Sequence, residues 1–438
     1  MRIEATSELS RAGAGFHYVG GRLTASGVAL EDVLAATGAA FVYDAARIDA
    51  ACRALVAAFP APLAGVRYAI KANTNPSVLT RVRGHGMGAE VASGGEMRLA
   101  LDAGFAPGDI VLNGNGKTDA ELAAAVEAGA GFVSADSPVE LDRLERAAGR
   151  AGRSVRALLR VNPDVDAHTH PYIATGLAET KFGMTPVEAL SACARTGDWP
   201  HVKLAGLHVH IGSQLLDLHP LEDALAEALQ ILDAGRAAGA PLATLDLGGG
   251  FGIDYAGDGV TFPLEAWGRT LCAAGQARGL TVLVEPGRFV VGDAGALVGR
   301  VLDVKRAPAR TFVVLDVAMN DLLRPALYEA HHRIVPLREA APGAPPLVAD
   351  VVGPVCESGD TFARGRALAP VSPGDGVAIL DAGAYGYAMS SNYNARGRLP
   401  EVLLDAGRAR RIRRGETTAD LVRLACDEPL RLPAAPRT

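Results

Sequence analysis

The sequence predicts an α/β protein in which a (β/α)8 barrel is followed by a mostly β C-terminal domain that also packs the N-terminal segment. Three observations lead to this fold class. Short aliphatic runs occur eight times between residues 66 and 285, helix-start signals stand between them, and strand-like runs continue after Arg288 without comparable helices. Eight alternating strands and helices close such a barrel, which usually takes ~250 residues. The 438 residues are therefore expected to divide into an N-terminal segment (1–40), a barrel (41–290) and a β domain (291–438).

The expected barrel strands are evenly spaced. The first four aliphatic runs begin 21 or 22 residues apart, which is the length of a strand, a helix and two short loops. The eight runs are residues 66–71, 88–93, 109–114, 131–136, 155–162, 204–211, 244–249 and 281–285. Capping-box patterns predict three helix starts, at Thr118 with Glu121, Ser137 with Glu140, and Thr185 with Glu188. Glycines are expected to end helices at Gly104, Gly129, Gly149 and Gly239.

The β domain is expected to contain strands at 296–304, 311–317, 347–352, 376–380 and 401–405. One more strand-like run, residues 41–43, follows the first 40 residues. Residues 336–346 are rich in Pro and Ala and predict a surface loop, and residues 431–438 predict a loose tail.

Composition excludes several classes of protein. Hydrophobic residues make up 49% and charged residues 21%, which is typical of globular proteins and excludes disorder of the whole chain. A net charge of -6 indicates neither nucleic acid nor an anionic membrane as partner, so the partner is expected to be a small molecule. The five cysteines show no C-x-x-C spacing, and no apolar run is long enough to cross a membrane. A cytoplasmic protein is therefore expected.

Polar side chains gather where the predicted barrel strands end. In a barrel these ends meet on one face, where barrel enzymes place their chemistry. The start of a loop explains any one polar residue, but eight polar strand ends together favour a site. They are Lys71, Glu90 with Ser93, Asn113, Asp136, Asn162, His210 with Ser213, the run Gly248, Gly249 and Gly250, and Glu285 with Arg288.

Lys71 and Glu285 are charged residues at the ends of apolar strands, where an unpaired charge is costly. A desolvated lysine has a lowered pKa and forms Schiff bases readily, although a solvated lysine is the plainer alternative. Glu285 needs a cationic partner, and a protonated pyridine nitrogen would serve. The glycine run suits one phosphate, which Arg288 could also bind unless it forms a structural ion pair.

His208 and His210 lie two residues apart, so a metal pair is the first hypothesis for them. No third ligand follows at a recognisable spacing, and His168 and His170 lie in a loop of unknown position, so no metal is expected. The better interpretation is that the His210 ring stacks on a flat heteroaromatic cofactor whose phosphate Ser213 binds. Together these residues predict pyridoxal 5'-phosphate as the cofactor.

Six motifs carry a resemblance to a known family: YAIKAN (68–73), GLHVHIGSQ (206–214), LGGGFG (247–252), EPGR (285–288), RPALY (324–328) and GPVCESGD (353–360). With them the chain resembles the barrel-type pyridoxal-phosphate decarboxylases, and within that family it is most similar to the diaminopimelate decarboxylases, from about residue 41 to 405. Residues 160–172 and 181–183 are also close to that group. Residues 329–331 depart from its pattern, which is expected to alter the rim of the pocket and not the chemistry.

The resemblance implies roles for the site residues. Lys71 would form a Schiff base with the cofactor, His210 would stack on its ring, and Glu285 would pair with the ring nitrogen. The phosphate region would be held by Ser213, Gly248, Gly249, Gly250 and Arg288. The substrate's distal carboxylate, or the cofactor phosphate, would be gripped by Arg288, Arg324, Tyr328 and Tyr385.

The resemblance also implies a homodimer with shared sites. Cys356 would return a proton to the substrate's Cα in the partner's site, although a cysteine beside acidic residues is more often inert. Glu357 would bind the substrate's distal ammonium group.

The implied reaction is the decarboxylation of meso-2,6-diaminopimelate to L-lysine and carbon dioxide, the last step of lysine biosynthesis. Two arginines favour a substrate with two carboxylates, because ornithine or lysine would leave Arg324 without a partner. The alternative is a related decarboxylase acting on carboxynorspermidine, ornithine or lysine. A regulatory relative without catalysis is a third possibility, against which the presence of Lys71 and Cys356 argues.

Overall fold

Eight parallel strands close into a barrel, as the sequence predicts, in the order β10-β11-β12-β5-β6-β7-β8-β9. The computed structural model describes residues 15–163 and 181–425, so residues 1–14, the pair His168 and His170, Cys426 and the tail at 431–438 lie outside the described residues. The barrel strands are β5 (Ala64–Ala69), β6 (Gly88–Val91), β7 (Ile110–Leu112), β8 (Phe132–Ala135), β9 (Val155–Arg160), β10 (Val202–His208), β11 (Thr244–Asp246) and β12 (Thr281–Val284). Each corresponds to one of the eight predicted runs.

The barrel has a small inner core and a large outer one. Val111, Phe132, Leu158 and Leu283 form a separate cluster, while the residues on either side of Val111, Leu158 and Leu283 belong to the main core under the helices. This alternation shows that the four side chains point into the barrel. Among the described residues the barrel interior is therefore packed, and the cavity described below lies beyond it, where the strands end.

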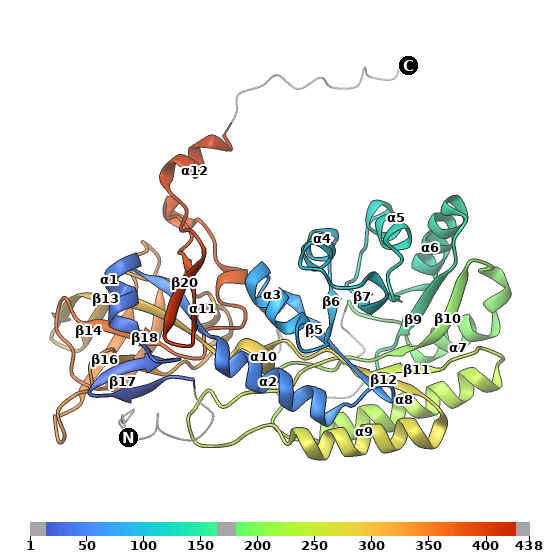
Figure 1. The fold of residues 1–438 in the computed structure, drawn as a ribbon, viewed down its shortest axis with the longest axis horizontal. Helices are drawn as coiled ribbons and strands as arrows, with labels where there is room; N and C mark the ends of the chain where they lie inside the picture. Colours follow the sequence, from blue (N-terminus) through green and yellow to red (C-terminus); the bar gives the residue numbers. More distant parts are fainter. Residues whose placement is uncertain (1–14, 164–180, 426–438) are drawn as a thin grey trace.

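Helices cover the outside of the barrel (Figure 1). They are α2 (Ala45–Ala58), α3 (Pro76–Arg83), α4 (Gly94–Asp102), α5 (Asp119–Ala128), α6 (Pro138–Ala151), α7 (Pro186–Ala194), α8 (His219–Ala237) and α9 (Leu264–Arg278). Helices α5 and α7 begin with the predicted capping boxes. At α6 only half of the box forms, because the Glu140 carboxylate accepts from the Asp136 N–H and not from Ser137. Gly149 does not end α6, which continues to Ala151 and stops at Gly152 with φ 62°.

The second body is a nine-stranded sheet whose main path runs β17-β16-β14-β13-β4-β19-β20, with β18 pairing β13 and β15 pairing β18. Its strands are β4 (Ala40–Asp44), β13 (Gly295–Arg306), β14 (Thr311–Leu315), β15 (Ile334–Pro336), β16 (Leu347–Val352), β17 (Thr361–Leu368), β18 (Gly376–Ile379), β19 (Glu401–Asp405) and β20 (Arg408–Arg413). The five predicted strands are confirmed. Two strands that were not predicted, β17 and β20, lie at the edges of the sheet and carry arginines. Edge strands tolerate charged side chains, and these arginines interrupt the apolar pattern by which a strand is recognised in the sequence.

The N-terminal segment packs on this β domain, as predicted. Strands β1 (His17–Val19), β2 (Arg22–Ala25) and β3 (Val28–Ala29) form a small sheet beside α1 (Leu30–Thr37). Leu23 and Leu30 share a core with Val298 and Leu337 of the β domain. The run at 41–43 forms β4, which pairs with β13 and β19. The domain boundaries at residues 40 and 290 stay predictions.

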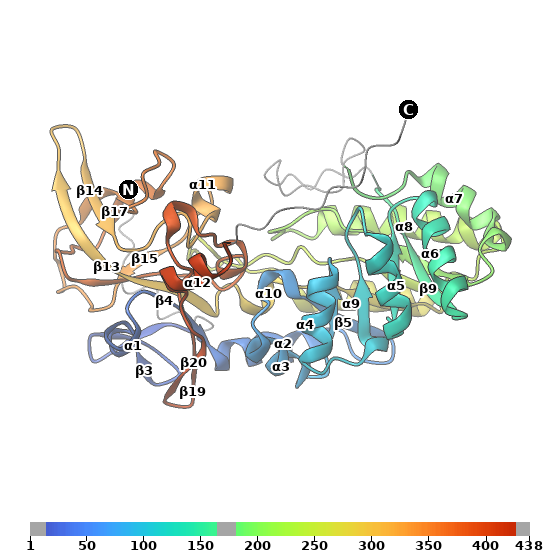
Figure 2. The same cartoon turned by 90° about the horizontal axis from the view of Figure 1, so that it is seen from above.

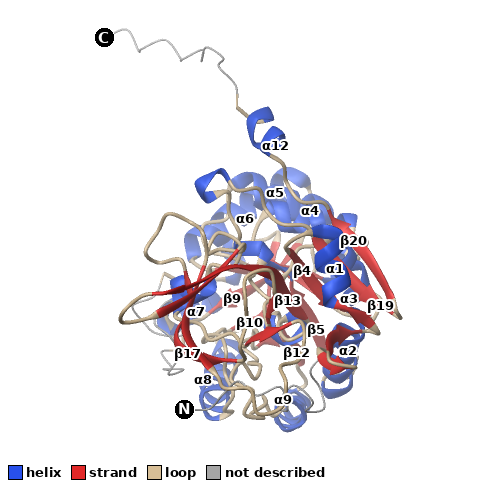
Figure 3. Cartoon of the chain, turned by 90° about the vertical axis from the view of Figure 1, so that its left-hand side faces the viewer, coloured by secondary structure: helices blue, strands red, loops and turns tan. Residues whose placement is uncertain are grey.

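The two bodies lie end to end, with the β domain at one end and the barrel at the other (Figure 2). Figure 3, viewed from the β-domain end, shows the strands of the second body in front of the barrel helices. A buried carboxylate helps to join them: Glu401 on β19 accepts from the Tyr43 hydroxyl and from Asn75 Nδ2, each at 2.7 Å, and pairs with Arg413. Asn75 follows the first barrel strand, so this contact links the two bodies.

The remaining helices are short. They are α10 (Arg288–Val291), α11 (Arg324–Tyr328) and α12 (Thr418–Arg423), the last of which projects from the body of the molecule in Figure 1. Within the described residues, none of the helices has the length and apolar character required to cross a bilayer.

Candidate active site

A cavity of about 390 Å³ lies where the barrel strands end. Most of the predicted site residues line it: Lys71, Glu90, Asn113, His210, Ser213, Gly249, Gly250, Glu285, Arg288, Arg324, Tyr328 and Tyr385. They come from strand ends far apart in the sequence, and the barrel topology brings them together. Arg324 and Tyr328 come from α11 of the second body, and Tyr385 comes from a loop after β18.

Lys71 is the basic group on one side of the cavity. It lies in a 3-10 turn, η2 (Ile70–Ala72), just beyond the end of β5 rather than in the strand. Its Nζ is 2.9 Å from Oε2 of Glu90, whose side chain is fully buried. The Lys71 side chain is 43% accessible because it faces the cavity.

The charge state of Lys71 differs from the sequence prediction. Burial lowers the pKa of Lys71, but the charges of Glu90, Tyr385 and Glu285 outweigh burial and hold that pKa above its ordinary value. The predicted lowering of the Lys71 pKa is therefore wrong. The reason is Glu90, a neighbour whose contact the sequence does not reveal.

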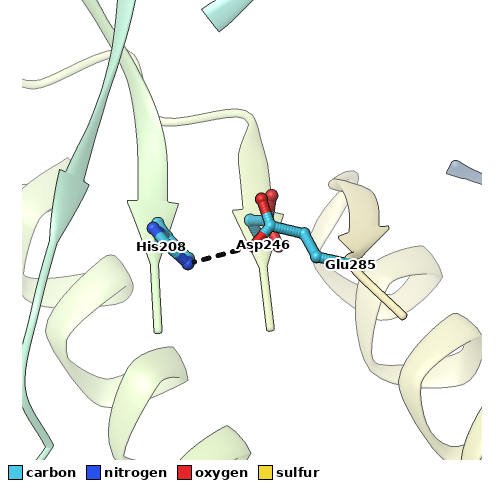
Figure 4. A group of neighbouring side chains, drawn as sticks. All are labelled: His208, Asp246 and Glu285. Carbon is cyan, nitrogen blue, oxygen red and sulfur yellow. Dashed lines mark ion pairs between the residues drawn. The ribbon is translucent and has the colours of Figure 1, made fainter. Parts of the chain in front are cut away.

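Glu285 is held by an amide and an imidazole. Asn113 Nδ2 lies 2.7 and 2.9 Å from the two carboxylate oxygens, and His208 Nε2 lies 3.5 Å from Oε2. Figure 4 shows the His208 ring directed toward this carboxylate. Burial favours the neutral acid, but His208, Lys71 and Asn113 outweigh it and lower the pKa of Glu285 to about 2. Glu285 is therefore a buried carboxylate.

Asp246 is the third member of the group drawn in Figure 4. Its Oδ1 accepts from the Gly248 N–H at 2.9 Å, and its Oδ2 is buried without a hydrogen-bond partner among the described residues. Burial and the Glu285 charge raise the pKa of Asp246 well above its ordinary value. Two carboxyl groups this close cannot both ionise, so Asp246 is the protonated one.

The structure groups His208 with Asp246 and Glu285. One possible metal-ligand atom from each of these three residues lies within 4.8 Å of the others, a spacing that a cation could use. The ionised member of this group is Glu285, and its carboxylate is already contacted by His208 and Asn113. The expectation that the site uses no metal stays a prediction.

His210 is a neutral ring. The Gly249 N–H donates to its Nδ1 at 3.3 Å, so Nδ1 carries no proton. Burial, Lys71 and Arg160 lower the pKa of His210 to about 3. The glycines permit this approach, since a Cβ on Gly248 would stand 2.7 Å from His210 Nδ1 and one on Gly249 would stand 2.2 Å from the Glu285 carbonyl oxygen.

Two buried arginines face the same cavity. Arg288, 6% exposed, donates from Nη1 to the Tyr255 hydroxyl at 2.6 Å and from Nη2 to Ser213 Oγ at 2.8 Å. Arg324, 5% exposed, lies over the Tyr255 ring and contacts His332. In the part of the chain that the structure describes, neither arginine has a carboxylate partner. Buried cations without counter-charges are costly, so this side of the cavity suits anions.

Tyr385 is fixed by its backbone. Its N–H donates to the Ala72 carbonyl at 2.8 Å, and its φ of 57° is uncommon for a residue other than glycine. The Arg288 guanidinium lies 5.1 Å from the centre of its ring. The strained backbone thus places this ring between the lysine turn and the arginines.

Cys356 and Glu357 lie outside the cavity of their own chain. Both are exposed, in the loop between β16 and β17. The Cys356 N–H donates to Asn394 Oδ1 at 3.0 Å, and the Tyr393 hydroxyl lies 3.5 Å from Glu357 Oε2. The structure of one chain therefore does not bring these two predicted residues to the site.

Several residues of the site were missed from the sequence. Tyr255 and His332 organise the arginines, Asp246 accompanies Glu285, and Arg160 and Phe182 line the cavity. Asp246 carried a usable signal, because it is a charged residue at the end of an apolar strand like Glu285. Tyr255 and His332 carried no such signal, because both residues lie in loops whose course the sequence does not predict.

Residues 45–292 match the family model described as pyridoxal-dependent decarboxylase, pyridoxal binding domain. A diaminopimelate decarboxylase of Neisseria meningitidis is 45% identical over 352 residues, which cover 80% of this chain and 86% of that protein. One from Pseudomonas aeruginosa is 41% identical over 414 residues, 93% of this chain and 97% of that protein. The chain belongs to the diaminopimelate decarboxylase family.

The fold of the family is also shared. The crystal structure of diaminopimelate decarboxylase from Helicobacter pylori complexed with L-lysine matches with a TM-score of 0.85 and 38% identity, covering 90% of this chain and 98% of that one. Like the family, the chain uses pyridoxal 5'-phosphate. The site fits this cofactor, because an amine, a buried carboxylate and an uncompensated guanidinium group surround one cavity.

Proposed function

We propose that the protein decarboxylates meso-2,6-diaminopimelate to L-lysine and carbon dioxide, the last step of lysine biosynthesis. One observation carries the choice of substrate: the cavity holds two buried guanidinium groups without carboxylate partners among the described residues. The cofactor phosphate accounts for Arg288. Arg324 then needs a second anion, and the distal carboxylate of diaminopimelate supplies it.

The cofactor would be held by residues that already face the cavity. Lys71 would bind its aldehyde carbon, Glu285 its ring nitrogen and His210 the face of its ring. Its phosphate would be bound by Ser213, Gly248, Gly249, Gly250 and Arg288. Bound there, pyridoxal phosphate would supply an electron sink for the electron pair that stays on the substrate carbon when carbon dioxide leaves.

The surrounding groups set the charges that this chemistry needs. Asn113 and His208 keep Glu285 ionised, so it can hold a proton on a facing nitrogen. His210 stays neutral and adds no competing positive charge. Lys71 must lose a proton before its amine can react, and the Glu90 carboxylate, 2.9 Å from its Nζ, opposes that loss by stabilising the charged form.

The substrate would meet residues from two subunits. Arg324, Tyr328 and Tyr385 would bind the distal carboxylate. Cys356 would deliver a proton to Cα, and Glu357 would bind the distal ammonium group. Because these last two are exposed and remote from their own cavity, they support a homodimer in which each subunit completes its partner's site. L-Lysine in the Helicobacter pylori structure retains the carboxylate that this scheme assigns to Arg324.

A cytoplasmic location is part of the proposal. The four cysteines in the described ranges, Cys52, Cys193, Cys272 and Cys356, are unpaired, as expected in a reducing compartment.

The deciding experiment measures carbon dioxide release from diaminopimelate, carboxynorspermidine, ornithine and lysine by the cofactor-loaded protein. We expect kcat/KM for diaminopimelate to exceed the others by about 100-fold or more, since each competitor leaves a buried cation unpaired. Faster release from carboxynorspermidine or ornithine would assign the chain to the alternative activity. Cofactor binding without turnover of any of the four would indicate an inert relative.

A further inference from the structure

Arg324 is held by two uncharged aromatic side chains rather than by a carboxylate. Its guanidinium carbon lies 4.7 Å from the centre of the Tyr255 ring, and its Nη1 lies 2.9 Å from His332 Nε2. Its Nε is buried without a hydrogen-bond partner among the described residues. An arginine held in this way keeps its full charge for an incoming anion.

His332 can make its contacts in only one protonation state. The side chain is fully buried, with Nδ1 2.9 Å from the Leu380 carbonyl oxygen and Nε2 2.9 Å from Arg324 Nη1. A carbonyl accepts only, so Nδ1 carries the hydrogen. An arginine donates only, so Nε2 is the acceptor. The neutral ring protonated at Nδ1 satisfies both partners, and burial beside Arg324 lowers the pKa of His332 well below its ordinary value.

Tyr255 separates the two arginines. Its hydroxyl accepts a hydrogen bond from Arg288, and the Arg324 guanidinium lies over the face of its ring. Its ring also packs edge-on against His332, with 5.3 Å between the ring centroids. Arg288 is turned toward Ser213, while Arg324 is turned toward His332. The arrangement therefore keeps two anion sites side by side and distinct.

We propose that His332 is a positioning residue that sets the specificity of the site for a second carboxylate. By accepting one Nη1 hydrogen of Arg324, it leaves Nε–H and the other N–H groups for a carboxylate, which arginine binds with two parallel hydrogen bonds. This inference rests on the proposed function, in which Arg324 binds the distal carboxylate. A purely structural role for His332, satisfying buried polar groups, is the alternative that the experiment must separate.

Two substitutions divide the contacts of His332. In His332→Gln the longer amide can place its oxygen near the position of Nε2 and still accept from Arg324. In His332→Asn the shorter amide can keep a donor to the Leu380 carbonyl but does not reach Arg324. His332→Leu, apolar and of similar size, replaces the asparagine variant if that variant does not fold. Cofactor content and thermal unfolding show which variants are folded.

The probes are L-lysine and 1,5-diaminopentane, which differ only by the carboxylate. Their inhibition constants are measured on the cofactor-loaded enzyme with diaminopimelate as substrate. We expect His332→Asn to raise the inhibition constant of L-lysine by about tenfold or more, while that of diaminopentane changes by less than about threefold. In His332→Gln both inhibition constants should stay within about threefold of those of the unaltered enzyme. The KM for diaminopimelate should rise in the asparagine variant with kcat changed much less.

Several outcomes would overturn the inference. Equal losses for the two probes, unchanged L-lysine binding in His332→Asn, or a glutamine variant no better than asparagine would each leave His332 with a structural role. Arg324→Gln combined with His332→Asn should weaken L-lysine no more than Arg324→Gln alone, and additive losses would contradict positioning. If the unaltered enzyme binds the two probes equally and does not decarboxylate diaminopimelate, it is the proposed function that fails.

Discussion

Replacing Glu90 by glutamine should make Lys71 reactive at lower pH. A protonated lysine is not a nucleophile, and Glu90, 2.9 Å away, is the main group that holds the pKa of Lys71 above its ordinary value. The Glu90→Gln side chain keeps the shape and loses the charge. The pKa of Lys71 should then fall, because burial, which favours the neutral amine, is no longer outweighed by Glu90.

The size of the effect follows from the geometry. Two unit charges about 3 Å apart attract by about 5 kcal/mol at an effective dielectric constant of ~20. The cavity exposes 43% of the Lys71 side chain, so water screens much of this attraction. We therefore expect about 1.5–3 kcal/mol, which lowers the pKa by about one to two units. Each unit increases the neutral fraction tenfold while the pKa stays above the working pH.

The assay adds pyridoxal phosphate to protein stripped of cofactor and follows the absorbance of the bound cofactor between about pH 6 and 9. At each pH in this range the initial rate of incorporation should be about ten- to a hundredfold higher in Glu90→Gln. Glu96→Gln is the matched control, because Glu96 bonds the Ala92 N–H at 2.7 Å and not Lys71. An unchanged rate in Glu90→Gln, or an equal increase in the control, would refute the reasoning.

Three further outcomes are expected. Mixed Lys71→Ala and Cys356→Ala subunits, each inactive alone, should regain carbon dioxide release if sites are shared, and confirmed heterodimers without activity would contradict that. Asn113→Ala removes the amide that holds Glu285, a contribution of about 1.5–3 kcal/mol, so the acidic limb of the kcat/KM profile should move up by about one to two pH units; a superimposable profile would count against this role. Glu401→Leu leaves the half-buried Arg413 unpaired and removes the acceptor of the Tyr43 hydroxyl and the Asn75 amide, so it should lower the free energy of unfolding in urea by about 1–3 kcal/mol, and an unchanged free energy would disprove the importance of this link between the two bodies.

The barrel could be predicted because its signals are local. Each strand is a short aliphatic run, and the starts of α5 and α7 depend on a cap and a glutamate only three residues away. The edge strands β17 and β20 could not be predicted, because their arginines disguise them and only pairing with distant strands makes them strands. The half-formed box at α6 shows the same limit, since Glu140 is drawn to Asp136 and Lys117.

The candidate site divides in the same way. Lys71, His210 and Glu285 could be selected from the sequence, because a barrel gathers its strand ends on one face. Their surroundings could not be selected. Asn113 and Glu285 are separated by 172 residues and meet only in the closed barrel. Cys356 was chosen by resemblance alone, and a single chain leaves it away from the cavity.

Which chemical groups line the cavity is therefore determined by the amino-acid sequence through local strand and helix signals. Which of those groups carry charge is decided by the tertiary structure. A pKa depends on burial and on neighbours within a few ångströms, and here Glu90, Asn113 and His332 come to their partners from other strands and loops. For that reason the sequence alone suggested a lowered pKa for Lys71, whereas neighbouring charges raise that pKa in the folded protein.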